Sequence, residues 1–152
     1  MPDDSLLARL ELLNQHVRDL RDAQAPNFAA YENDKMLRRY TERMLHMAID
    51  ACIQIGIGLL TQEGLRRPEN YHDVFIVLGE HAILPQETVD CMTALVEFRN
   101  LLVYEYSTVD NMMVYGFAKR RLNDFTDFSK AVREYLRDQT IVDSSSSGTL
   151  IR

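Results

Sequence analysis

The chain has 152 residues, of which 46% are hydrophobic and 26% are charged, with only six glycines and four prolines. This composition predicts one domain with a substantial hydrophobic core, and it excludes a disordered tail or a collagen-like repeat. The 17 Lys and Arg residues against 23 Asp and Glu residues give a net charge of −6. That balance excludes a strongly basic binder of long nucleic acids, although local basic clusters could still make a small nucleic-acid contact.

The two cysteines, Cys52 and Cys91, lie within apolar helical stretches rather than at the turn positions of a secreted disulfide framework. We therefore expect two core thiols and a reducing, cytoplasmic location. The N-terminus lacks the basic and apolar regions of a signal peptide. The most apolar stretch, Met44–Leu60, is short for a membrane span and holds three polar residues. It predicts the buried central helix of a soluble domain, without membrane contact.

The first predicted element is a helix with a narrow apolar seam. Its apolar residues alternate steps of four and three behind the acidic starters Asp3 and Asp4. A seam this narrow predicts that the helix packs along a single partner, in this chain or in a second copy. The seam consists of Leu6, Leu10, Leu13, Val17 and Leu20.

The remaining elements are also helical, and each is bounded by capping or turn residues. In chain order they are a loop over Ala23–Asn33, a long helix over Asp34–Gln62, a short helix from Asn70 to about Leu78, a turn over Gly79–Leu84, a helix from Gln86 to about Val103 behind Pro85, and a final helix from Asp110 or Asn111 to about Asp138. No stretch shows the period of two that is typical of a strand. The sequence therefore predicts an all-α, up-and-down bundle over residues 1–142. Residues 143–152, which include SSSSG, predict a flexible Ser-rich tail.

A stripe of polar side chains runs along the long helix. His46, Asp50 and Gln54 follow at steps of four and continue the side that holds Arg39 and Arg43. Because a buried charge needs partners or water, the stripe predicts a polar pocket or interface. The alternative is an Asp–Arg pair plus a satisfied histidine within one core. His46 has no second His or Cys one turn away, so we expect no metal site.

The helix that ends near Val103 carries a second polar stripe on the side opposite its apolar face, which consists of Cys91, Leu95, Phe98 and Leu102. Arg99 and Tyr106 are seven residues apart, so a continuous helix would project them in nearly the same direction beside this stripe. A guanidinium can bind phosphate through two parallel hydrogen bonds, and a carboxamide can orient a neighbouring group. The alternative is a solvated helix face with tyrosine-rich packing, and spacing alone does not specify a chemistry. The stripe consists of Thr93, Glu97, Asn100 and Tyr104.

Residues 98–110, FRNLLVYEYSTVD, resemble the signature Arg-Asn-x-x-Val-His-x-Tyr of HEPN-domain proteins of the HepT type. The resemblance continues upstream through YENDKMLRRYTERMLHMAIDACIQIG and RRPENYHDVFIVLGEHAILP, and so covers residues 31–110. It implies a four- or five-helix bundle that forms a homodimer and brings two Arg-x4-His-x-Tyr segments into one cleft. It also implies a metal-independent endoribonuclease without cofactor, commonly the toxin of a bacterial toxin–antitoxin pair. The implied partner is an MNT-type nucleotidyltransferase antitoxin that adds AMP to the motif tyrosine.

Mapped onto this chain, the resemblance assigns Arg99 as phosphate clamp and transition-state stabiliser and Asn100 as positioning group. Tyr106 is the AMP acceptor, unless it is a structural residue that packs by its ring. Asp50 and Glu97 are expected to support the cleft. AMP on Tyr106 would place bulk and negative charge beside Arg99 and block phosphate binding.

One position departs from the signature, because Tyr104 stands where the motif histidine belongs. In the family that imidazole moves a proton as the 2′-hydroxyl of RNA attacks the adjacent phosphate. A phenol, with an ordinary pKa near 10, is a poor base at neutral pH, and losing general acid–base help costs on the order of 10²–10⁴ in rate. Tyr104 is therefore either an inactivating substitution or a natural variant that binds without cutting. A third alternative is that His46 or His72 reaches the cleft and replaces the missing imidazole.

Three basic clusters could guide an RNA such as tRNA if they rim the dimer cleft. The alternative for each cluster is surface ion pairing with nearby carboxylates. The clusters consist of Arg38, Arg39 and Arg43, of Arg66 and Arg67, and of Lys119, Arg120 and Arg121.

Taken together, the sequence predicts a HepT-like toxin ribonuclease that is weak or inactive because of Tyr104. The runner-up is a non-catalytic helical interaction module that partners a nucleotidyltransferase.

Overall fold

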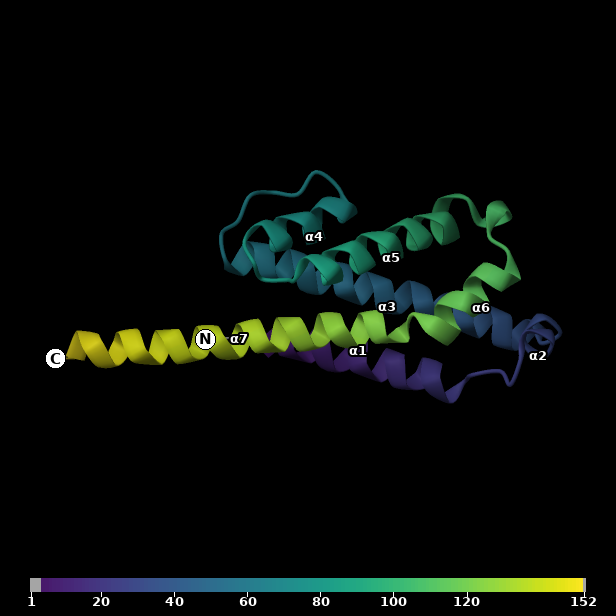
Figure 1. Cartoon of the computed structure of the whole chain (residues 1–152), viewed down its shortest axis with the longest axis horizontal. Helices are drawn as coiled ribbons and strands as arrows, with labels where there is room; N and C mark the ends of the chain where they lie inside the picture. The colour runs from purple at the N-terminus through teal and green to yellow at the C-terminus, as the bar shows by residue number, and fades with distance from the viewer. Residues whose placement is uncertain (1–3, 152) are drawn as a thin grey trace.

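The computed structural model describes the backbone of residues 4–151 and the side chains of residues 4–141. Over this part of the chain all regular secondary structure is helical, and no strand is present. The long helices alternate in direction: α1 (Asp4–Asp22), α3 (Lys35–Gln62), α5 (Gln86–Tyr104) and α7 (Leu122–Ile151) (Figure 1). The connecting segments hold α2 (Phe28–Glu32), α4 (Tyr71–Glu80), the 3-10 turn η1 (Tyr106–Thr108) and α6 (Asn111–Arg120). The predicted all-α up-and-down bundle is confirmed.

Helix α1 packs through the predicted seam, and all five seam residues are buried. His16 is buried beside them and widens the apolar face. With this wider face α1 contacts both α3 and α7. The expectation of a single partner is therefore wrong, because the seam and its flank together cover two helices.

Side-chain caps mark most of the predicted helix starts. The carboxylate of Asp34 accepts a hydrogen bond from the Leu37 N–H, and the amide oxygen of Asn70 accepts one from the Asp73 N–H. These contacts satisfy backbone donors that have no partner within the first turn of a helix. A side-chain cap also marks one helix start that the sequence did not predict. Asn27 accepts from the Ala30 N–H and begins α2 inside the expected loop.

The expected final helix is divided into α6 and α7 at Arg121. The division lets two apolar faces pack in different places. Val114 and Ala118 of α6 are buried, and this helix contacts α2 and α3. Phe125 and Phe128 of α7 are buried as well, and α7 contacts α1 and α5. Helix α7 also continues past the expected end near Asp138 and extends beyond the other helices (Figure 1). That residues 143–152 form a separate flexible tail stays a prediction, and residue 152 lies outside the described residues.

Helix α3 is the central helix of the core, as predicted. By length and composition it could cross a membrane, but 56% of its most apolar window is buried inside the protein, as in a core helix. Its Cys52 is fully buried, and burial raises the pKa of this thiol. Cys91 on α5 is only half-buried, so the prediction of a core thiol is right for one cysteine and incomplete for the other.

Candidate functional site

Arg99 is held in place by contacts from three helices. Its Nε donates a hydrogen bond to Asp50 Oδ1 on α3 at 3.0 Å, and its Nη1 donates one to Asn100 Oδ1 on α5 at 3.1 Å. The Tyr71 ring, at the start of α4, covers the guanidinium with its centroid 5.0 Å from Cζ. Only 12% of the Arg99 side chain is exposed. The guanidinium therefore has one defined orientation, which a flexible surface arginine lacks.

Asp50 joins Arg99 to a histidine. Its second carboxylate oxygen, Oδ2, lies 3.0 Å from Nε2 of His46, one helical turn earlier on α3. The Asp–Arg pair with a satisfied histidine, left open by the sequence, is thus present. It does not lie in a closed core, because 42% of the Asp50 side chain and 25% of the His46 side chain are exposed.

Asp50 also opens onto a groove of about 340 Å³ between α1 and α3. Arg9 and His16 line it from α1, and Arg43 and Met47 line it from α3. The polar stripe of the long helix therefore meets both expectations. It makes an ion pair with α5, and it borders a partly polar groove.

Opposing effects act on the pKa of Arg99. Partial burial lowers it, while side-chain hydrogen bonds with Asp50 and Tyr104 raise it more, so that it lies above the ordinary value for arginine. The guanidinium is permanently charged. Of its five N–H donors, the contacts with Asp50 and Asn100 occupy two. Donors on both terminal nitrogens remain outside these two contacts.

Tyr104 is the last residue of α5, and 73% of it is exposed at the outer edge of this site. Beyond it the helix stops, because Glu105 has a φ of −133° and a ψ of 44°. Tyr106 follows in η1 and therefore does not continue the direction of Arg99. The argument that helical spacing brings Tyr106 close to Arg99 is wrong.

The Tyr106 hydroxyl instead lies against the N-terminal half of α3. It donates a hydrogen bond to Glu42 Oε2 at 2.7 Å and accepts one from Arg39 Nη1 at 3.1 Å. The hydrogen bond to Glu42 is the main reason that the pKa of Tyr106 lies above its ordinary value. Glu42 precedes Asp50 by two turns, about 12 Å along a helix. Tyr106 and Arg99 thus contact α3 at two positions, Glu42 and Asp50, that lie two turns apart.

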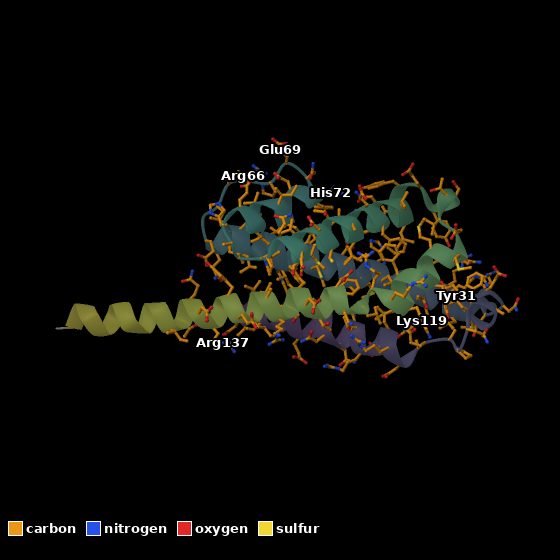
Figure 2. All side chains as sticks on the ribbon, viewed as in Figure 1. Tyr31, Arg66, Glu69, His72, Lys119 and Arg137 are labelled. Atoms are coloured by element: carbon orange, nitrogen blue, oxygen red, sulfur yellow. The ribbon has the colours of Figure 1, made fainter. Side chains whose placement is uncertain are left out.

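Two other predicted residues take no part in these contacts. Glu97 is exposed on α5, and among the described residues it has no hydrogen bond or ion pair. His72 on α4 follows Tyr71, and its Nε2 is buried without a hydrogen-bond partner (Figure 2). It makes no described contact with Asp50 or Arg99. Within the described residues, no group of three or more His, Cys, Asp or Glu side chains could hold a metal ion.

Sequence reasoning missed Glu42 and Tyr71. Glu42 had a usable signal, because it stands three residues after Arg39 and four before His46 on the polar side of the long helix. Tyr71 had none, since only the crossing of α4 over α5 brings its ring to Arg99.

Two of the basic clusters contain an arginine that forms ion pairs. Arg66 pairs with Asp73 at 2.8 Å and with Glu80 at 3.0 Å, and Arg121 pairs with Asp124. The ion-pair alternative therefore holds for these two arginines. Arg66 and Lys119 lie at opposite ends of the helix bundle, so their clusters do not form one patch on a single chain (Figure 2).

Comparison with known proteins places this geometry in a family. Residues 13–132 match the family described as Ribonuclease HepT-like. The tRNA nuclease HepT of Aphanizomenon flos-aquae is 25% identical over 128 residues, which cover 84% of this chain and 87% of that protein. The mRNA nuclease HepT of Shewanella oneidensis is 20% identical over 131 residues, covering 86% of this chain and 98% of that protein.

A solved structure has the same fold. It contains a tri-AMPylated Shewanella oneidensis HEPN toxin in complex with an MNT antitoxin. The TM-score is 0.81 at 20% identity, and the match covers 88% of this chain and 99% of that one. Because the family match extends over most of the chain and the fold agrees with it, this protein belongs to the HepT-like ribonuclease family.

Proposed function

We propose that this chain is the ribonuclease toxin of a toxin–antitoxin pair, acting as a homodimer on RNA in the cytoplasm. The observation that carries the proposal is the fixed, largely buried Arg99 beside the partly exposed Asp50 and His46. A preorganised guanidinium stabilises the negative charge that develops on phosphate during cleavage, without having to reorient at that moment. Asn100 and Asp50 act as positioning groups, because each holds one edge of that guanidinium.

Tyr104 does not replace the motif histidine as the proton acceptor of this reaction. At neutral pH its phenol is a poor acceptor for the proton of an attacking 2′-hydroxyl, since the ordinary pKa of tyrosine is near 10. We therefore propose that the chain cleaves RNA weakly. Glu97 has no contact that supports the role expected for it, and we assign it none.

The substitution Tyr104→His tests this proposal. Purified Tyr104→His protein should cleave tRNA or mRNA faster than the unmodified chain, by up to about 10²–10⁴-fold. Adding Arg99→Ala to that variant should remove the gain. Both RNA classes belong in the assay, because the two nuclease relatives are named for different targets. Absence of cleavage by Tyr104→His would favour the runner-up, a non-catalytic helical module that partners a nucleotidyltransferase.

For regulation, we propose that a nucleotidyltransferase partner adds AMP to the Tyr106 hydroxyl. The support is chemical, because the hydroxyl is partly exposed and hydrogen-bonded to Glu42, and it lies beside Arg39, whose charge suits an incoming phosphate. AMP on Tyr106 adds bulk and negative charge beside α3, next to Glu42 and about two turns from Asp50. RNA would then be repelled before it reaches Arg99.

Incubation with the partner enzyme and ATP tests this second step. Intact-mass measurement should show that AMP is added to the chain without substitutions and that none is added to Tyr106→Phe. Tyr104→Phe is the matched control, because it also removes one exposed phenolic hydroxyl from the same segment. This variant should still receive AMP. Normal modification of Tyr106→Phe would show that another residue is the acceptor.

A further inference from the structure

The position that lacks the motif imidazole has a histidine close by. We propose that His46 supplies the proton-transferring imidazole in this chain, an inference that rests on the ribonuclease function proposed above. One carboxylate holds both groups that the reaction needs, because Asp50 Oδ2 lies 3.0 Å from His46 Nε2 and Asp50 Oδ1 lies 3.0 Å from Arg99 Nε.

The geometry fixes the imidazole ring. His46 and Asp50 are four residues apart on α3, so the helix itself sets their separation. The contact to Asp50 uses Nε2 and leaves Nδ1, which has no hydrogen-bond partner among the described residues. One quarter of the His46 side chain is exposed. Arg99, which lies on the other side of the shared Asp50 carboxylate, is only 12% exposed. The ring is therefore both oriented and reachable from solvent.

The chemistry of the three groups is complementary. An imidazole with an ordinary pKa near 6.5 can accept a proton at neutral pH, and a neighbouring carboxylate orients it and stabilises the imidazolium that forms. As the 2′-oxygen bonds to phosphorus, its proton passes to Nδ1 of His46 and the bond to the 5′-oxygen breaks. The leaving 5′-oxygen takes a proton from water, and the imidazolium returns its proton to the hydroxide that forms, which leaves a 2′,3′-cyclic phosphate, a 5′-hydroxyl and the neutral imidazole. Arg99 stabilises the charge on the phosphate throughout.

The other histidines lack this arrangement. His72 has its Nε2 buried, and His16 is buried on α1. His81 is exposed at the end of α4 and makes no described contact with Asp50 or Arg99. His46 alone among the described histidines shares a carboxylate with the guanidinium. His81 therefore provides a matched control for the loss of a histidine.

The test compares cleavage of RNA by the purified full chain and its His46→Gln and His81→Gln variants. We expect measurable cleavage by the unmodified chain, a loss of about 10²-fold or more in His46→Gln, and no change in His81→Gln. We also expect Tyr104→His to restore cleavage to His46→Gln, because it supplies an imidazole from α5. Added imidazole should raise the rate of His46→Ala and leave Arg99→Ala inactive. A purely structural role for His46 would give neither form of rescue.

Two results would overturn the inference and leave the ribonuclease function standing. One is an unchanged rate in His46→Gln, and the other is an inactive unmodified chain beside an active Tyr104→His variant. Cleavage by neither the unmodified chain nor Tyr104→His would overturn the proposed function together with the inference. The activity of the double variant His46→Gln, Tyr104→His also shows whether a chain with His46→Gln folds. Unfolding of the His46→Gln protein can therefore be distinguished from the loss of a catalytic group.

Discussion

Arg99 shows which properties of a candidate site residue depend on its neighbours in the sequence and which depend on residues far along the chain. Its position in the motif could be read from the sequence, and so could the adjacent carboxamide of Asn100. Its main partner is Asp50, 49 residues away, and no spacing rule joins residues on different helices. The two polar stripes were visible separately, but only the packing of α5 against α3 brings them together.

Removal of the Asp50 carboxylate should destabilise the protein as well as the site. Asp50→Ala leaves a guanidinium with 12% exposure without its charged partner, which we expect to lower the free energy of unfolding by about 1–3 kcal/mol. Urea denaturation measures this. Glu97→Ala removes an exposed carboxylate without a described partner and should change stability by less than about 0.5 kcal/mol. Equal stability of the two variants would mean that Asp50 does not hold Arg99.

Tyr106 marks the limit of spacing arguments at this scale. Residues seven apart share a helix face only while the helix continues, and α5 ends at Tyr104. The backbone at Glu105 turns Tyr106 toward Glu42, 64 residues earlier in the chain. The helix was expected to end near Val103, which is one residue from its observed end, so the spacing argument for Tyr106 extended the helix past its own predicted end.

At the scale of elements, helix starts were more predictable than helix partners. Asp34, Asn70 and Asp110 each cap the helix that follows, and capping is a contact within a few residues. The division between α6 and α7 was missed, because apolar residues continue on both sides of Arg121. What divides them is the need to bury one face against α2 and α3 and the other against α1 and α5.

The contact between α3 and α4 depends on a glycine. A Cβ added at Gly56 would lie 2.5 Å from Cγ1 of Val74, a buried and branched side chain that cannot move away easily. Gly56→Ala should therefore push α4 outward and cost about 1–3 kcal/mol of stability. Because α4 begins at Tyr71, the same shift should loosen the ring that covers Arg99.

Thermal or urea unfolding measures the cost of Gly56→Ala. Gly116→Ala is the matched control, since the nearest atom to its added Cβ is the far end of the exposed Arg120 side chain. Alanine favours helix over glycine by about 1 kcal/mol, so this control should be neutral or more stable. A Gly56→Ala protein as stable as the control would contradict a close approach of α3 and α4.

At the scale of the whole molecule, the proposed homodimer would bring a second copy to the site. The resemblance implies that two motif segments share one cleft, and each chain of 17.6 kDa contributes a single Arg99. A two-fold dimer presents the same surface from both copies, so each mutated chain would damage a cleft that it shares with its partner.

Mixed dimers test this sharing. Equal amounts of Tyr104→His chains with and without Arg99→Ala, exchanged to equilibrium, should retain about one quarter of the cleavage activity if a cleft needs both arginines. Independent sites would retain about half. Light scattering on the same samples should give twice the mass of the chain, and a monomer would contradict the dimer outright.

The sequence by itself determined where α1, α3, α4 and α5 lie, which of their faces are buried and which arginine stands in the motif. It could do so because periodicity, capping and motif spacing are properties of neighbouring residues. The contact of Asp50 with His46 is local to one helix, whereas tertiary structure alone decided that Asp50 binds Arg99 and that Tyr106 contacts Glu42 and Arg39. Those contacts depend on how helices cross and where α5 ends, and the packing of the whole core sets both.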